Sequence, residues 1–223
     1  MGKIMSVILL LILSVLLFLV TGCANSGGLA VSGKAGTLGL GGELTTRMTS
    51  NINARVGVNA LDLDFDAEAE DVEYDVGLEL RSFTALLDWH IFDDPFRISA
   101  GILVNENELS LKASPTTTEE LGGTPYTPDE IGTLSGRVDF DDLAPYVGIG
   151  WGNALDRNQR WGFYFDLGVA YTRSPHIALK ANGSLASDPA FQADLARERD
   201  DIEDKLKRFR FYPVISIGLF YRF

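Results

Sequence analysis

The chain ends with Ser216-Ile217-Gly218-Leu219-Phe220-Tyr221-Arg222-Phe223, and this stretch decides the fold. From Ile215 to Phe223 every second residue is large and apolar or aromatic. Three of the four residues between them, Ser216, Gly218 and Arg222, are polar or tiny. Because successive side chains of a β-strand point to opposite faces, the pattern predicts a strand with one apolar face.

Six stretches upstream alternate in a similar way. They are Leu38–Met48, Ile52–Val58, Tyr74–Arg81, Phe96–Val104, Pro145–Trp151 and Trp161–Tyr171. Most of them set each apolar residue against a charged residue or a glycine, as expected where one face of a strand meets lipid and the other a packed polar lumen. A soluble sandwich or calycin-type barrel also has alternating strands, so the alternation alone leaves that class open.

The strand count points to a missing element at the start. With the C-terminal strand, the stretches amount to seven. Single-chain bacterial membrane barrels have an even number of strands, so a short first strand at Gly28–Ser32 is expected, which gives eight. In one of the stretches, Tyr74, Val76, Leu78 and Leu80 are predicted to face lipid.

Four residues at the C-terminus carry a resemblance to a known family. Ser216, Gly218, Tyr221 and Phe223 resemble the polar residue, the glycine and the two outward aromatics of the terminal strand of Gram-negative outer-membrane β-barrels. In that family this strand is the signal that the barrel-insertion machinery reads. The mature chain as a whole resembles the small OmpA-type and opacity-type barrels. The resemblance implies a monomer in the outer membrane, contact with its lipid and lipopolysaccharide, and no cofactor.

The N-terminus predicts export. Lys3 precedes an apolar run, Ser6–Val20, that is short for a transmembrane helix and is followed by small residues. This predicts a signal peptide over residues 1–24 and a barrel domain over residues 25–223.

Two kinds of processing fit the end of this segment. Gly22 and Ala24 have the small-x-small spacing of an ordinary cleavage site, whereas Leu19–Cys23 resembles a lipobox that would leave Cys23 as a lipidated N-terminus. The sequence leaves both open. Cys23 is the only cysteine, so the chain forms no intramolecular disulfide.

The charge balance excludes one class of partner. The chain has 19 basic and 31 acidic residues, a net charge of −12. Nucleic acid demands a basic surface, so we expect no nucleic-acid binding.

Connection lengths predict the orientation of the barrel. The short connections are Thr49–Asn51, Ile91–Pro95 and Asn153–Gln159, and the long ones are Asp66–Asp71, Ala113–Gly132 and Arg173–Arg208. Membrane barrels have short periplasmic turns and long external loops, so the long segments are expected outside. Within the last of them, Ser187-Asp188-Pro189 is a helix start, and a helix is predicted over residues 188–208.

The inward positions carry charges of both signs. The predicted lumen network comprises Glu43, Arg47, Arg55, Glu79, Arg81, Arg97, Asp166, Arg210 and Arg222. Charges that face a narrow lumen must pair because an isolated buried ion is costly. Eight strands leave an interior that side chains can fill, so a closed core is favoured over a conduction pathway, with a narrow porin as the alternative.

The sequence offers few candidate residues for catalysis or for metal binding. The two histidines, His90 and His176, have no nucleophile at a fixed spacing, so we expect no enzyme, with an outer-membrane lipid-modifying activity as the second alternative. Asp62, Asp64, Asp66 and Glu73 occupy positions of a calcium-loop register, but an alanine stands where that loop needs glycine, and a solvated acidic loop is favoured. The predicted role is structural or surface-interacting.

Overall fold

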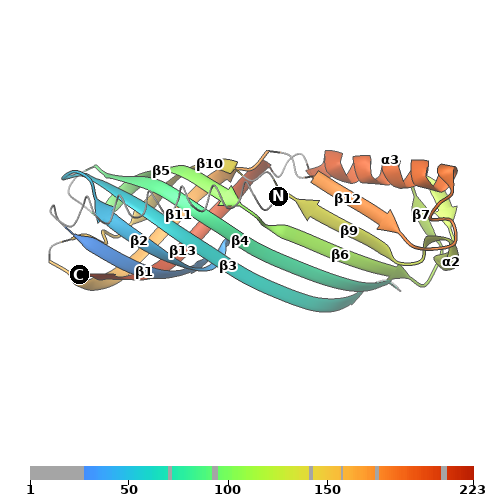
Figure 1. Cartoon of the computed structure of the whole chain (residues 1–223), viewed down its shortest axis with the longest axis horizontal. Coiled ribbons are helices and arrows are strands. Elements are labelled where there is room, and N and C mark those ends of the chain that lie inside the picture. The colour runs from blue at the N-terminus through green and yellow to red at the C-terminus, as the bar shows by residue number, and fades with distance from the viewer. Residues whose placement is uncertain are drawn as a thin grey trace, which may run out of the picture.

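The computed structural model describes residues 28–69, 72–91, 95–140, 143–156, 158–173, 176–206 and 210–223. The predicted signal peptide and Cys23 lie outside these ranges. Eight strands form a closed ring in which each strand pairs antiparallel with the next and the last pairs with the first (Figure 1). In order they are β1 (Leu29–Gly36), β2 (Gly39–Arg47), β3 (Ile52–Ala69), β4 (Val72–His90), β5 (Phe96–Asn105), β10 (Leu143–Trp151), β11 (Trp161–Tyr171) and β13 (Phe211–Arg222). The predicted eight-stranded barrel is confirmed, and β1 is the expected first strand.

The outer surface of the ring is apolar. Residues that pair directly across two antiparallel strands share a face, and in β11 and β13 the pair Trp161 and Tyr221 begins a row of outward apolar side chains that ends at Tyr171 and Phe211. Trp151, paired with Phe96, lies at the same end as Trp161. Strands of about 9 to 11 residues are long enough to cross the hydrocarbon of a bilayer. None of the helices in the described ranges is long and apolar enough to span a bilayer.

One end of the barrel carries the short connections and the C-terminus. The β2–β3 turn closes with a hydrogen bond from Met48 N to Ile52 O, and the Thr49 hydroxyl accepts from Ile52 N at 3.0 Å. Phe223 N donates to Leu29 O at 2.9 Å, which ties the two chain ends of the ring together. We call this the short-turn end.

At the opposite end two strands of the ring, β3 and β4, continue into an extension. Residues 61–69 of β3 and 72–80 of β4 run on past the ring, and β4 there pairs with β6 (Glu108–Pro115). β9 (Leu134–Asp139) and β12 (His176–Ala181) complete this outer sheet. Beside β12 lies α3 (Pro189–Leu206), and the hairpin of β7 (Glu119–Leu121) and β8 (Thr124–Tyr126) and the short α2 (Pro128–Ile131) lie near the tip (Figure 1).

The outer sheet replaces much of what the sequence indicated as loop. The expected loop at Asp66–Asp71 is occupied by the ends of β3 and β4, and the expected loop at Ala113–Gly132 contains β7, β8 and α2. Backbone polar groups in a long external segment need partners, and the paired strands provide them.

The predicted lipid face of β4 requires a correction. Tyr74, Val76, Leu78 and Leu80 stand on the same face of β4 as Asp88, which points into the lumen, so they face inward and lie beyond the ring. The part of β4 that crosses the ring is residues 82–90, which pair with β5. The apolar side changes because the outward face meets lipid along the ring and water along the extension.

The predicted helix in the last long connection is confirmed as α3. The Asp188 carboxylate accepts hydrogen bonds from Ala190 N at 2.8 Å and Phe191 N at 3.1 Å, which caps its first turn. Buried Phe191 and Leu195 of α3 pack with Leu121, Tyr126 and Ile131 from the tip. The helix therefore belongs to a small core of its own.

Candidate functional site

The lumen at the short-turn end holds a compact set of paired charges, here called the polar network. Its members are Lys34 of β1, Glu43 of β2, Arg55 of β3, Asp88 of β4, Arg97 of β5 and Asp166 of β11. Three cations face three carboxylates, so the network has no net formal charge. Each comes from an inward position of a different strand, so closing the ring is what brings them together.

Arg55 is the centre of the polar network. Its side chain is 4% exposed and lies 3.3 Å from Glu43 Oε1, 3.0 Å from Asp88 Oδ2 and 2.7 Å from Asp166 Oδ2. It also donates to the Ser99 hydroxyl at 3.3 Å. A buried guanidinium is tolerated when carboxylates neutralise it and most of its donors are used. Both terminal nitrogens of Arg55 donate hydrogen bonds, whereas its buried Nε lies 3.0 Å from Asp88 without forming one.

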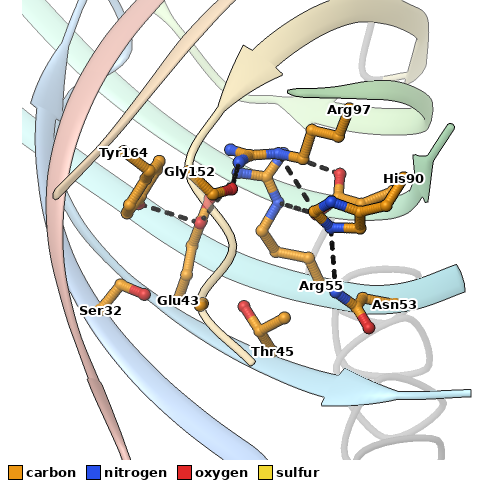
Figure 2. A pocket seen from close by; sticks show the side chains of 11 residues that line it. Ser32, Glu43, Thr45, Asn53, Arg55, His90, Arg97, Gly152 and Tyr164 are labelled. Carbon is orange, nitrogen blue, oxygen red and sulfur yellow. Dashed lines mark hydrogen bonds and ion pairs between the residues drawn. The ribbon is translucent and has the colours of Figure 1, made fainter. Parts of the chain in front are cut away.

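Further contacts fix the carboxylates. Arg97 Nη2 lies 2.6 Å from Asp166 Oδ1, and the Ser99 hydroxyl donates to Asp88 at 2.6 Å. The Tyr164 hydroxyl donates to Glu43 at 3.0 Å, and the Arg97 guanidinium lies 5.4 Å from the centre of the Tyr164 ring (Figure 2). Every acid of the network thus has more than one donor.

Glycines make room for these large side chains. A Cβ at Gly150 would lie 2.5 Å from Asp166 Oδ1 and 2.8 Å from Arg97 Cζ. A Cβ at Gly218 would lie 2.3 Å from the Tyr164 ring. Gly150 and Gly218 are therefore contact surfaces for arginine and tyrosine side chains.

The connection between β10 and β11 closes the short-turn mouth. Arg97 donates to the carbonyl of Gly152, and Arg47 donates to the carbonyl of Leu155, whose side chain is fully buried. His90 is buried at the same mouth, where its ring lies 3.1 Å from the Asn53 amide. The space left among these residues is about 10 Å³ (Figure 2), which holds about one water molecule.

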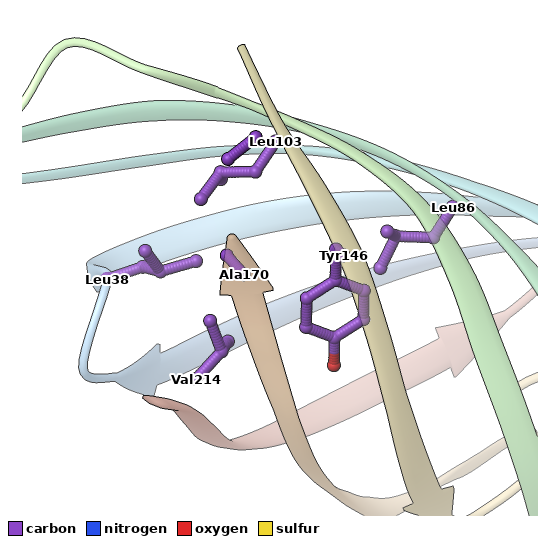
Figure 3. Packing of buried hydrophobic residues seen from close by; sticks show 7 residues of the cluster. Leu38, Leu86, Leu103, Tyr146, Ala170 and Val214 are labelled. Atoms are coloured by element: carbon purple, nitrogen blue, oxygen red, sulfur yellow. The ribbon is translucent and has the colours of Figure 1, made fainter. Parts of the chain in front are cut away.

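The other half of the lumen contains an apolar cluster, and Asn59, Ser82 and Asn105 are buried beyond it. Leu38, Leu86, Leu103, Ala144, Tyr146, Ala170 and Val214 are buried together in a cluster, here called the apolar layer (Figure 3). The alternation of Leu38–Met48 predicts Leu38 on the same lipid-facing side as Leu40, but Leu38 lies in the β1–β2 turn, before β2 begins at Gly39, and is buried. A space of about 20 Å³ separates the apolar layer from the polar network. Both halves of the lumen are therefore filled.

Only some of the predicted lumen charges lie in the lumen. Glu43, Arg55, Arg97 and Asp166 are in the polar network, and Arg47 lies at its mouth. Glu79 and Arg81 pair with each other at 3.3 Å on the water-facing side of the outer sheet. Arg210 is exposed next to β13, and Arg222 donates to the Gln159 carbonyl at the barrel end.

Sequence reasoning missed two members of the network. Lys34 lies just past the short first strand that was expected, and Asp88 lies in the part of β4 that was not recognised as a strand. Lys34 lies two residues after the inward Ser32, and Asp88 lies four residues after the inward Thr84. Because side chains at even spacing along a strand share a face, these neighbours could have indicated that both charges point inward.

The weak metal candidates are not assembled into a site. Asp62, Asp64 and Asp66 alternate along an extended strand, and this geometry differs from the loop that calcium needs. Over the residues that the structure describes, no three His, Cys, Asp or Glu side chains come together in a group that could hold a metal ion.

Comparison with known proteins shows the fold. No protein-family model matches the chain, and no curated protein is similar to it in sequence. The crystal structure of CarO2 from Acinetobacter baumannii is similar with 20% identity and a TM-score of 0.62, over 88% of this chain and 99% of that chain. CarO from the same organism is similar with 18% identity and a TM-score of 0.55, over 86% of this chain and 96% of that chain.

Both A. baumannii proteins are outer-membrane β-barrels. The chain has the fold of a small outer-membrane β-barrel. Membrane barrels place short turns in the periplasm, so we expect the short-turn end to be periplasmic and the outer sheet to be external. Trp151 and Trp161 would then lie at the periplasmic interface, where indole rings are favoured.

Proposed function

We propose that this outer-membrane barrel is a closed, non-catalytic protein with a structural and surface-interaction role. One observation carries the proposal: the lumen is filled along its length, by the polar network in the periplasmic half and by the apolar layer in the external half. Among the described residues, the spaces beside the polar network and next to the apolar layer are about 10 and 20 Å³, which is too small for a hydrated solute.

The same contacts oppose the alternative of a narrow porin. A pore needs charged groups that a passing solute can reach, whereas the acids of the polar network are already bound by arginine, lysine and hydroxyl donors. Opening a path would require breaking buried ion pairs, at a cost of roughly 3 to 5 kcal/mol for each pair. The interaction role rests instead on the outer sheet, because it is the part that projects away from the membrane.

We propose that the C-terminal strand carries the insertion signal. Tyr221 and Phe223 are exposed on the lipid side of β13, with ring centres 5.3 Å apart, where a membrane-bound receptor can reach them. Ser216 and Gly218 face the lumen, where Gly218 contacts the Tyr164 ring. The glycine therefore has a packing role in addition to a proposed recognition role.

Solute uptake into vesicles tests the closed barrel. Lipid vesicles that contain the refolded protein are mixed with isotonic glycine or arabinose, and swelling is followed by light scattering. Vesicles with this barrel are expected to swell no faster than empty ones, while vesicles with an open porin swell quickly. Swelling above the empty control would contradict the proposal and favour the porin.

A further inference from the structure

The two edges of the outer sheet differ in what lies beside them. On one edge, β12 lies beside α3, and Leu179 and Ala181 of β12 pack against the core that contains Phe191 and Leu195 (Figure 1). On the other edge, β2 stops pairing with β3 at Ala60, and residues 61–69 pair only with β4 within the described ranges. Every second residue of that segment directs its backbone N–H and C=O away from β4. An unpaired edge of this length is a template for another strand.

The side chains along this edge alternate sharply. Leu61, Leu63 and Phe65 stand on the inner face of the outer sheet, with Leu63 and Phe65 about half exposed. Asp62 and Asp64 stand on the other face, as does Asp66, and all three are exposed. Asp62 lies 3.7 Å from Arg81, whereas Asp64 and Asp66 form no ion pair with any described residue.

The apolar inner face continues from this edge across the sheet. Leu63 is paired with Leu78 of β4, and Leu78 with Leu109 of β6. Leu109 and Leu111 are exposed on that face, although they lie on the external side of the barrel, away from the lipid belt. A strand added beside β3 would extend the apolar surface by a row of its own side chains and cover Leu63 and Phe65.

We propose that residues 61–69 of β3 bind an extended polypeptide segment that alternates apolar and basic residues and adds to the outer sheet as a further strand. This assignment deepens the proposed surface-interaction role and rests on it. The apolar side chains of the segment would lie beside Leu61, Leu63 and Phe65, and its lysines or arginines would lie beside Asp64 and Asp66.

The acidic side chains along this edge disfavour two other occupants, a second copy of this chain and an acidic or neutral segment. A second copy of this chain paired through the same edge would place Asp62, Asp64 and Asp66 against the same three carboxylates, and like charges directly opposite each other are destabilising. An acidic or neutral segment would leave Asp64 and Asp66 without a counterion. The chain has a net charge of −12, which attracts a basic segment from a distance as well.

Binding of a synthetic strand tests the assignment. The probe is a fluorescent peptide of alternating valine and lysine, as long as residues 61–69, and its anisotropy is measured against the full mature protein in zwitterionic detergent at low salt. Saturable binding is expected. The same peptide with N-methyl groups on successive amides is expected to lose binding, because it cannot form the backbone ladder.

Two charge-matched variants locate the site. Asp62→Asn/Asp64→Asn/Asp66→Asn is expected to weaken binding about tenfold at low salt and less at high salt. The control, Asp200→Asn/Asp201→Asn/Asp204→Asn on exposed positions of α3, removes the same charge and is expected to leave binding unchanged. Unchanged heat-modifiable gel mobility shows that each variant is folded.

Three results would overturn the assignment: no saturable binding, equal binding by the N-methylated peptide, or equal weakening by the α3 variant. Each of these would leave the closed lumen untouched, because vesicle swelling tests the lumen separately.

Discussion

Replacing Arg55 with methionine should destabilise the barrel strongly although it removes no apolar surface. Arg55 lies 3.3, 3.0 and 2.7 Å from the carboxylates of Glu43, Asp88 and Asp166. Without it, three carboxylates share two cations, and the network changes from neutral to a net charge of −1.

The loss of stability depends on which cations remain close to each carboxylate after the substitution. Two of the three carboxylates retain a close cation, at 2.5 and 2.6 Å. Asp88 retains the Ser99 hydroxyl at 2.6 Å, but its remaining cation, Arg97, is 3.7 Å away. One buried carboxylate is left poorly paired, and breaking a buried pair in this way costs about 3 to 5 kcal/mol.

Urea unfolding in phospholipid vesicles, followed by tryptophan fluorescence, measures this cost. The matched control is Arg81→Met, which breaks an exposed pair with Glu79 at 3.3 Å and should cost about 0 to 1 kcal/mol. Arg55→Met/Asp88→Asn should recover part of the loss, because it removes the poorly paired charge. If Arg55→Met lost no more stability than Arg81→Met, the polar network would not hold the barrel together as argued.

Three further outcomes are expected. Gly150→Ala should lower the free energy of unfolding by about 1 to 3 kcal/mol, because its Cβ would lie 2.5 Å from a network carboxylate, whereas Gly33→Ala, with nothing within 4 Å, should have little effect in the same urea assay. Asp188→Ala should remove the cap of α3 at a cost of about 1 kcal/mol, seen as faster amide hydrogen exchange in its first turn, and unchanged exchange there would contradict the capping role. The hydrogen bond from the Tyr126 hydroxyl at 2.8 Å lowers the pKa of Asp194, so its stabilising effect is complete above the ordinary aspartate pKa and is lost as the pH falls through the lower folded value. Tyr126→Phe should move the acid loosening of α3, followed by pepsin cleavage within residues 189–206, to higher pH; an unmoved profile would mean that another group controls it.

The barrel could be predicted from sequence because one face of each crossing strand meets lipid. The rows that end at Trp161 and Phe223 show an uninterrupted period of two. The outer sheet was harder to predict, because there the apolar side chains change from the outward to the inward face of the strand. On β3 the apolar positions are even up to Ala60 and odd from Leu61, without any break in the pairing with β4. That change of phase marks the point where lipid gives way to water.

The site was predicted in part for a similar reason. Inward charges beside outward apolar residues indicated Glu43, Arg55, Arg97 and Asp166. The run Ala85-Leu86-Leu87 hid the strand that carries Asp88, because Leu86 belongs to the apolar layer and interrupts the alternation. A lumen that holds an ion-pair network in one half and an apolar cluster in the other has no single sequence signature, and only the closed ring shows which residues meet.

Electrical recording in planar lipid bilayers tests the closed lumen most directly. Folded protein, verified by heat-modifiable gel mobility, is inserted and the current is measured at a series of voltages. A barrel filled by the polar network and the apolar layer should give no steady conductance above the bare bilayer. Reproducible open channels of uniform conductance would contradict the closed barrel.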